Sequence, residues 1–227
     1  IAGQLSVIVG SYHLLRPNKG MGTLIGAFKN MEPRVVTVIG AGVAGTEAIE
    51  KAISNKAYLK IIDLSEKRLN ELKDIYGTDN IDYILSTESS IEEALKDSDL
   101  VIGAVYVIGK QAPKVVKNNM LENMKSGAVM VDISIDQGGC FESSRPTTHD
   151  EPTYLHNGVL HYCVTNMPGA VPLTATEALN KATLSYVLEL ANKGIEIALS
   201  ENLHLANGLN IKNGKVVHEA VKEALTS

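Results

Sequence analysis

The most constraining feature of this sequence is a short apolar run that ends in a glycine-rich turn. Residues 35–39, Val-Val-Thr-Val-Ile, are all β-branched and lie between Pro33 and Gly40. Such a run is typical of a strand buried on both faces, as happens when helices cover both sides of a parallel sheet. The chain is therefore expected to contain a layered α/β sheet.

The same strand pattern recurs and alternates with segments of helical length. Further strands are predicted at residues 58–62, 81–85, 99–103, 128–133 and 160–164, and helices at residues 43–54, 65–76, 89–96 and 118–124. Ser89 and Glu92 have the spacing of a capping box, which predicts Ser89 as the N-cap of its helix. This alternation predicts an α/β fold with a Rossmann-type, doubly wound parallel sheet and right-handed connections.

The two ends of the chain have a different pattern. Residues 4–15 predict a helix, residues 16–22 a turn-rich stretch, and residues 23–28 a short strand. After Pro172 only helices are predicted, at residues 174–200 and 217–224. We therefore expect a sheet domain at residues 1–170 and a C-terminal helical segment at residues 171–227.

Composition excludes several classes of protein. A net charge of −5 leaves no basic excess to neutralise phosphates, so nucleic acid is not expected as the main partner. No apolar run reaches the roughly 20 residues that span a bilayer, and no signal peptide is visible, so we expect a cytoplasmic protein without membrane contacts. Two cysteines and six scattered histidines lack ligand spacing, so no metal site is predicted. The chain begins at Ile1, which suggests that it was cut from a longer protein.

The glycine turn has the spacing of a dinucleotide-binding motif. Gly40, Gly42 and Gly45 fit G-x-G-x-x-G between a predicted strand and a predicted helix, and Asp63 ends the next strand. Gly40 permits the tight turn, Gly42 lets a diphosphate approach the backbone, and Gly45 lets the helix pack closely on the sheet. The alternative is an ordinary strand-to-helix turn, with Asp63 capping the next helix.

The acid at the end of the second strand bears on which coenzyme is bound. Asp63 is placed to accept hydrogen bonds from the adenosine ribose and to repel a 2′-phosphate, which favours NAD over NADP. Lys67 and Arg68 lie one turn onward and offset part of that repulsion.

Two polar residues follow later strands. Asp136 precedes a Gly-Gly pair after the strand at 128–133, and Asn166 follows the strand at 160–164. The carboxyl ends of strands face the ligand crevice in a doubly wound sheet, so both are candidates for orienting a ligand or assisting proton transfer. Each is equally compatible with a simple turn role.

Longer runs resemble one family throughout the chain. The sequence is similar to alanine dehydrogenases, and in part to the related transhydrogenase α subunit, at AV (104–105), APK (112–114), VDISIDQGGC (131–140), SRPTTHD (144–150), NMPGAVP (166–172) and ANKG (191–194). The resemblance implies reversible, NAD-dependent oxidative deamination of L-alanine to pyruvate and ammonia, in a protein that is commonly a hexamer. It also assigns a catalytic role to the position of Asp136. Asn166, which the resemblance places near the nicotinamide, is the second catalytic candidate.

The resemblance assigns further coenzyme contacts. Besides Asp63, Arg68 and the three glycines, these are Val43, Ala44, Ser86, Val105, Tyr106, Ile133, Ser134, Ile135, Asp136, Arg145, Val164, Thr165, Asn166 and Met167. Tyr106 departs from the aliphatic residue usual in the family. The family's substrate-binding domain precedes the position of Ile1, so residues 171–227 are expected to belong to an incomplete substrate domain. The chain alone is then expected to deaminate alanine poorly or not at all.

Two other functions are compatible with the sequence. One is the NAD(H)-binding component of a nicotinamide nucleotide transhydrogenase, which passes hydride between nucleotides without a small substrate. The other is a non-catalytic dinucleotide-sensing or ketimine-binding protein of related fold. Alanine-dependent reduction of NAD by the whole protein distinguishes the dehydrogenase from both.

Overall fold

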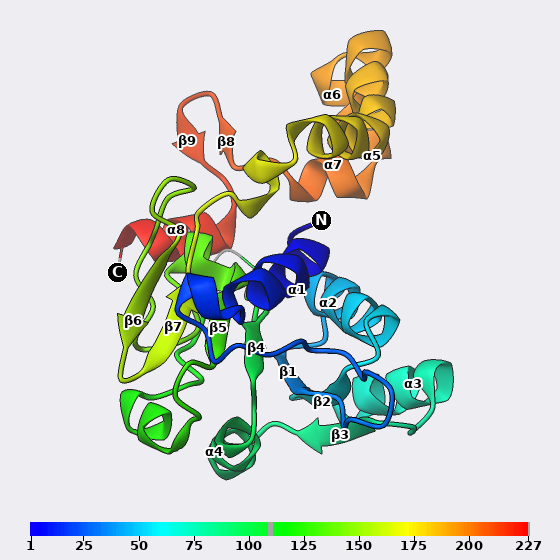
Figure 1. Ribbon diagram of the computed structural model, residues 1–227. Coiled ribbons are helices and arrows are strands. Elements are labelled where there is room, and N and C mark those ends of the chain that lie inside the picture. The colour runs from blue at the N-terminus through cyan, green and yellow to red at the C-terminus, as the bar shows by residue number, and fades with distance from the viewer. Residues whose placement is uncertain (109–110, 227) are drawn as a thin grey trace. The chain divides into compact units, whose positions relative to one another are not determined.

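The computed structural model describes residues 1–108 and 111–226. Residues 109 and 110, in the predicted sheet domain, and residue 227, in the predicted C-terminal segment, lie outside the described residues. The chain divides into two compact units, the first comprising Ile1–Tyr106 and Gln111–Pro168, the second containing residues 107–108 and 169–226 of the described chain (Figure 1).

The first unit is built on a seven-stranded sheet with the order β3-β2-β1-β4-β5-β7-β6. Six strands run parallel, and the edge strand β6 is antiparallel to β7. The strands are β1 (Val35–Ile39), β2 (Tyr58–Asp63), β3 (Ile81–Leu85), β4 (Leu100–Gly103), β5 (Val129–Asp132), β6 (Thr153–His156) and β7 (Val159–Tyr162). The strand order reverses on the two sides of β1, which places a ligand crevice at the carboxyl ends of β1 and β4.

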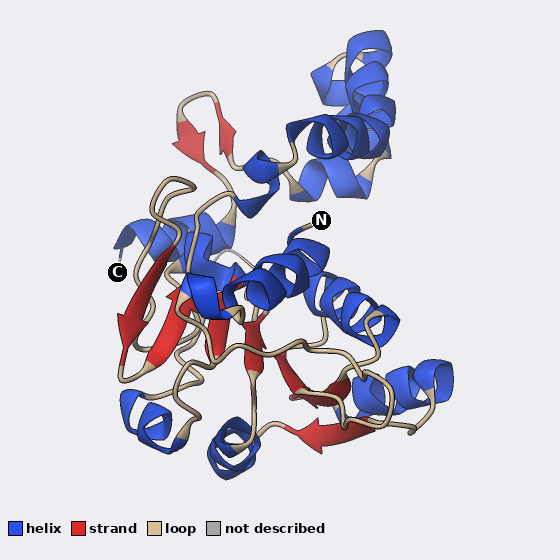
Figure 2. Ribbon diagram, viewed as in Figure 1, coloured by secondary structure: helices blue, strands red, loops and turns tan. Residues whose placement is uncertain are grey.

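Helices cover both faces of this sheet (Figure 2). Helices α1 (Ala2–His13) and α2 (Val43–Ser54) contact each other on one face, where a Cβ added to Gly10 would lie 2.4 Å from Leu100 Cδ1. The next strand residue, Val101, points the other way into a core built with α4 (Glu88–Lys96) and the 3₁₀ helix η2 (Asn118–Asn123). Helix α3 (Glu66–Tyr76) packs on β2 and β3. The predicted Rossmann-type, doubly wound sheet is confirmed.

The strand predicted at residues 23–28 is wrong. Phe28 forms only an isolated bridge with Met31. The segment's backbone groups bond to separate parts of the chain, since Ile25 accepts from Arg34 N and Ala27 donates to Lys56 O. Without one continuous partner strand, an apolar run forms no ladder.

The predicted N-cap at Ser89 is also wrong. The N-cap of α4 is Thr87, whose Oγ1 accepts a hydrogen bond from Ser90 N at 3.0 Å. Ser90 Oγ in turn accepts from Thr87 N at 2.9 Å, which completes a capping box two residues earlier than predicted. A serine at the third helical position is long enough to reach back, so the motif does not need Glu92.

Strand β6 was missed because it is short and lies at the edge. Its partner β7 begins at Val159, so the predicted strand at 160–164 is displaced by one residue at its start and two at its end. The two strands are joined by Asn157 and Gly158, both with positive φ. An Asn-Gly pair is the preferred two-residue hairpin turn, so the sequence did contain the signal.

The second unit is mostly helical. It contains α5 (Pro172–Lys193), α6 (Ile195–Glu201), α7 (Leu203–Asn207), a hairpin of β8 (Ile211–Lys212) and β9 (Lys215–Val216), and α8 (Glu219–Thr226). The single helix predicted at 174–200 is wrong, because Gly194 has φ +75° and separates α5 from α6. The expectation of helices alone after Pro172 is wrong at the hairpin, which turns at Asn213 and Gly214.

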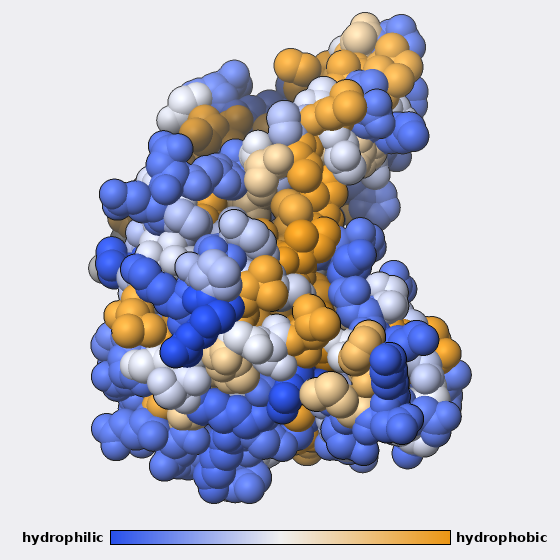
Figure 3. Space-filling view, in the orientation of Figure 1, coloured by the Kyte–Doolittle hydropathy of each residue, from blue (hydrophilic) through white to orange (hydrophobic). Residues whose placement is uncertain are grey.

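Apolar side chains remain exposed on both units. Helix α5 buries none of its residues and exposes Leu173, Leu179 and Val187, and α1 exposes Ile8. Figure 3 shows such side chains at the surface over α1 and, in the second unit, over α5 and α6. Among the described residues, no helix is both long enough and apolar enough to cross a bilayer.

Candidate functional site

The turn between β1 and α2 is shaped by two glycines. Gly40 has φ +94°, a left-handed conformation that side-chain-bearing residues rarely adopt. A Cβ on Gly40 would also lie 2.6 Å from Ala104 O, and one on Gly45 would lie 1.9 Å from Gly40 O. Helix α2 therefore begins directly against the end of the strand.

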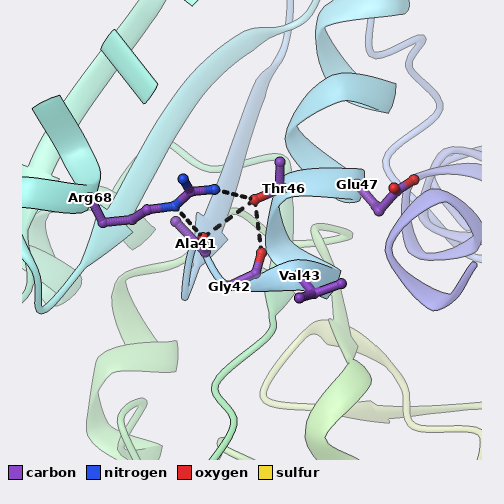
Figure 4. Close-up of a pocket in the computed structure, with 6 residues that line it drawn as sticks. All are labelled: Ala41, Gly42, Val43, Thr46, Glu47 and Arg68. Atoms are coloured by element: carbon purple, nitrogen blue, oxygen red, sulfur yellow. Dashed lines mark hydrogen bonds between the residues drawn. The ribbon is translucent and has the colours of Figure 1, made fainter. Parts of the chain in front are cut away.

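Gly42 faces open space at the amide end of α2. It is the N-cap of the helix. Among the described residues no side chain caps the first turn, and no atom beyond the chain neighbours of Gly42 lies within 4 Å of a Cβ built on it. An open hollow of about 440 Å³ lies here, lined by Ala41, Gly42, Val43, Thr46, Glu47 and Arg68 (Figure 4). Free first-turn amides at a helix N-terminus attract anions, so the hollow fits a phosphate group.

Asp63 lies at the glycine turn. Its Oδ2 accepts a hydrogen bond from Ala41 N at 2.7 Å, and its Oδ1 accepts from Ser65 N at 2.8 Å. The N-cap of α3 is Ser65, so Asp63 is not the cap that the alternative interpretation required. Each carboxylate oxygen retains capacity for another hydrogen bond, which a ribose hydroxyl can supply.

Arg68 braces the same turn. Its Nε donates to Ala41 O at 3.0 Å and its Nη2 to Thr46 Oγ1 at 2.9 Å (Figure 4). Its Nη1 donates to Glu71 Oε2 at 3.2 Å. The Lys67 side chain is almost fully exposed, 4.0 Å from Glu71. Bonds to the neutral Ala41 and Thr46 groups leave the positive charge of Arg68 in place, and the Glu71 carboxylate at 3.2 Å offsets part of that charge.

The remaining candidates around the adenosine side follow β3 and β4. Ser86 donates its backbone N–H to Asp63 O at 2.9 Å, so the ends of β2 and β3 are joined there. Val43 and Tyr106 are strongly exposed, Val105 is half-buried, and Ala44 lies in the first turn of α2.

The two predicted catalytic residues are brought together from separate loops. Asn166 N donates to Asp136 Oδ1 at 3.4 Å, and both side chains are exposed. Asn166 has φ +52°, a conformation that asparagine tolerates better than most residues, so its turn role is also present. His149 Nε2 lies 3.3 Å from Asn166 O.

Four other candidates in these two loops have buried side chains. Ile135, Val164 and Met167 are buried, as is Ser134, while Ile133 is half-buried and Thr165 is exposed. Any contact of Val164 or Ile135 with a ligand must therefore be made by the backbone. Ser134 Oγ donates to Val105 O at 2.7 Å, which links the ends of β4 and β5.

Arg145 is held by an aromatic ring. Its guanidinium carbon lies 4.1 Å from the centre of the Tyr154 ring, and its backbone N donates to Tyr154 Oη at 3.0 Å. Tyr154 also donates to Ser143 O at 2.7 Å, and burial raises the pKa of Tyr154, so the phenol stays protonated. The prediction that Arg145 contacts coenzyme is untested by these contacts.

Asp132 was not among the predicted residues. It ends β5, is fully buried, and its carboxylate accepts from Ser134 N and Cys140 N, each at 2.9 Å. The sequence did contain a signal for it, because an aspartate at the end of a strand and two residues before a serine has the pattern of an N-cap. In the described part of the chain, no group of three or more His, Cys, Asp or Glu side chains is arranged to hold a metal ion.

Comparison with known proteins gives consistent matches over nearly the whole chain. A family model described as alanine dehydrogenase/PNT, C-terminal domain, matches residues 6–219. The alanine dehydrogenase of Halomonas elongata is 47% identical over 224 residues, which are 99% of this chain and 60% of that protein. The chain therefore spans about 60% of the length of that relative.

Solved structures extend the comparison. A structure of an L-alanine dehydrogenase has a TM-score of 0.91 and 44% identity to this chain, covering 99% of this chain and 62% of that one. The transhydrogenase from Sinorhizobium meliloti has a TM-score of 0.73 at 22% identity, covering 96% of this chain and 59% of that one. The second likeness shows the fold alone.

Proposed function

Because the chain belongs to the alanine dehydrogenase/PNT C-terminal domain family, we propose that it binds NAD(H) as the coenzyme-binding part of an alanine dehydrogenase. The reaction proposed for the whole protein is the reversible oxidative deamination of L-alanine to pyruvate and ammonia. The 47% identity to an alanine dehydrogenase, against 22% to the transhydrogenase, supports the dehydrogenase over the transhydrogenase component.

The observation that carries the proposal is the open amide end of α2 beside Asp63. The first-turn amides above Gly42 have no side-chain cap, so they hold the coenzyme diphosphate. Asp63, fixed by Ala41 N, accepts the adenosine ribose hydroxyls and disfavours a 2′-phosphate, so NAD is the preferred coenzyme. Arg68 keeps the turn in shape through Ala41 and Thr46.

The nicotinamide side is formed by the loops that carry Asp136 and Asn166. The chemistry that a bound coenzyme would supply here is acceptance of the hydride from the α-carbon of alanine. The Asp136 carboxylate orients the ribose and the substrate ammonium group near that carbon, and Asn166 holds the same loop through its backbone N–H. The buried residues of both loops, Ser134, Ile135, Val164 and Met167, exclude water on this side. Arg145 adds a positive charge.

The second unit belongs, on this proposal, to a substrate domain that this chain contains only in part. Helix α5 buries none of its residues, as expected of a helix whose packing partner is supplied elsewhere. Hydride transfer needs both reactants held at near-attack distance, so the chain alone is expected to deaminate alanine poorly. Exposed apolar surface also supports self-association, for which we propose the hexamer of the complete enzyme.

Titration of the chain with NADH tests the coenzyme site. We expect saturable binding, and for Gly42→Ala at least a tenfold rise in Kd, about 1.4 kcal/mol, because its methyl group occupies the phosphate space. Gly42 has φ −71°, which alanine adopts freely, so thermal unfolding of this variant should match the parent chain.

Gly208→Ala is the matched control for this experiment. Gly208 also has a negative φ, and its added Cβ would meet nothing closer than 3.4 Å. Both the Kd and the thermal stability of this variant should be unchanged. Equal NADH affinity in the parent and Gly42→Ala, or no binding by the folded parent chain, would overturn the proposed site.

A further inference from the structure

A buried carboxylate stands at the base of the loop that carries Asp136. Asp132 accepts hydrogen bonds from the backbone N–H groups of Ser134 (2.9 Å), Cys140 (2.9 Å) and Phe141 (3.4 Å), and from the hydroxyl of Ser144. The Cys140 thiol also donates, with Sγ 3.5 Å from Oδ1. Only donors surround this carboxylate in the described residues, which is the environment of an ionised group.

No cation neutralises this charge among the described residues that act on it. Burial raises the pKa of Asp132 overall, and the hydrogen bonds from Ser144, Cys140 and Phe141 oppose that rise. The stabilisation of the carboxylate therefore comes from the loop itself. Conversely, the loop has its shape because its amides converge on one acceptor.

The path of the loop is built around the carboxylate. A Cβ added to Gly139, which has φ +79°, would lie 2.7 Å from Asp132 Oδ2. On the outer side, Lys114 Nζ donates to the carbonyl oxygens of Gly138 and Gly139. The loop thus directs its amides inward to the Asp132 carboxylate and the carbonyls of Gly138 and Gly139 outward to the Lys114 ammonium group. These opposed contacts hold residues 133–144 in one conformation.

We propose that Asp132 is a positioning residue: its buried carboxylate holds the 133–144 loop so that Asp136 meets the nicotinamide end of the coenzyme. The inference rests on the proposed coenzyme site. The inference goes beyond that site, because Asp132 is proposed to act through the loop without touching the ligand. It is proposed to affect the nicotinamide half of the site only. The adenosine half is held at Gly42 and Asp63, which have no hydrogen bond to this loop among the described contacts.

Asp132→Asn is the first test, because it keeps the shape and replaces one acceptor oxygen by an NH₂ donor. That NH₂ group meets N–H or O–H donors, so the loop has to move away. We expect the Kd for NADH to rise at least tenfold, while the Kd for ADP-ribose, which lacks the nicotinamide ring, changes less than twofold. A role in folding alone would move both ligands together.

Ser144→Ala keeps the test decisive if Asp132→Asn does not fold. It removes one donor and leaves the carboxylate, so we expect a three- to tenfold rise in the NADH Kd with ADP-ribose unaffected. Ser143→Ala is the matched control, because Ser143 Oγ bonds to His161 Nε2 at 2.7 Å and not to Asp132. Its NADH to ADP-ribose affinity ratio should equal that of the parent chain.

The outcomes separate the two proposals. If the parent chain binds neither NADH nor ADP-ribose, the proposed function fails. If the parent chain binds both and the affinity ratio is the same in Ser144→Ala and Asp132→Asn as in the parent, the positioning role is wrong while the coenzyme site stands.

Discussion

Replacement of His161 by Gln should change how the stability of the first unit depends on pH. His161 is fully buried on β7, where Nδ1 donates to Val159 O at 3.1 Å and Nε2 accepts from Ser143 Oγ at 2.7 Å. The carbonyl can only accept, so the ring is the neutral tautomer with its proton on Nδ1. Its ring stacks on Tyr154 with 5.1 Å between centroids.

The magnitude follows from the pKa of this imidazole. Burial lowers the pKa of His161 from 6.5 to about 4, with the nearby charge of His156 acting in the same direction and the bond to Val159 opposing it. The unfolded chain therefore binds the proton first, and stability present above pH 6.5 is lost as the pH falls towards 4. A pKa difference of about 2.5 corresponds to about 3 kcal/mol by pH 4 and about 2 kcal/mol by pH 5.

Urea unfolding of the parent chain and His161→Gln at pH 7, 6 and 5 measures this effect. Far-ultraviolet circular dichroism is the suitable signal because the chain has no Trp. Groups other than His161 titrate in both proteins, so the difference in unfolding free energy isolates this residue. We expect the parent's advantage at pH 7 to shrink by about 2 kcal/mol at pH 5. A difference that is constant across this range would refute the argument.

Four further substitutions test local features. Asp63→Ala should weaken NADH binding about tenfold or more, because charge-assisted bonds to the ribose are lost, and should reduce the difference in affinity between NADH and NADPH. An unchanged ratio of the NADH and NADPH Kd values in direct titrations would place Asp63 away from the ribose. Gly45→Ala should destabilise the chain by about 1–3 kcal/mol, since its Cβ would lie 1.9 Å from Gly40 O; thermal unfolding at the parent's temperature would contradict this. Thr87→Ala should lower the free energy of unfolding in urea by about 1 kcal/mol, and Ser89→Ala by less than about 0.5 kcal/mol. A larger loss for Ser89→Ala than for Thr87→Ala would identify Ser89 as the N-cap.

Much of the sheet could be predicted because its signals are local. Residues 35–39 are an apolar run between Pro33 and Gly40, residues 81–85 are mostly apolar with Asp82 among them, and the structure places β1 and β3 at those residues. The edge strand β6 was missed although the Asn157-Gly158 turn marks it, because its four residues carry no apolar pattern of their own. The run at 23–28 shows the converse error, since an apolar pattern forms a strand only where a partner strand is available.

The candidate site divides in a similar way. Gly40, Gly42 and Gly45 are recognisable from spacing because the conformation they permit depends on the residues themselves. The contacts of Arg68 could not be recognised in this way. Its hydrogen bonds to Ala41 and Thr46 depend on a turn 22 to 27 positions away in the chain. The position of Arg68 near Asp63 in the sequence therefore does not say which groups its guanidinium contacts.

Local sequence determined the strand-turn-helix unit at residues 35–54, since the chain conformation there follows from steric properties of glycine and β-branched residues. Only the tertiary structure decided that Asp132 is surrounded by donors from positions 134 to 144, and that Asp136 and Asn166 meet. Hydrogen bonding and burial depend on which groups converge in space, and a linear pattern does not contain that convergence.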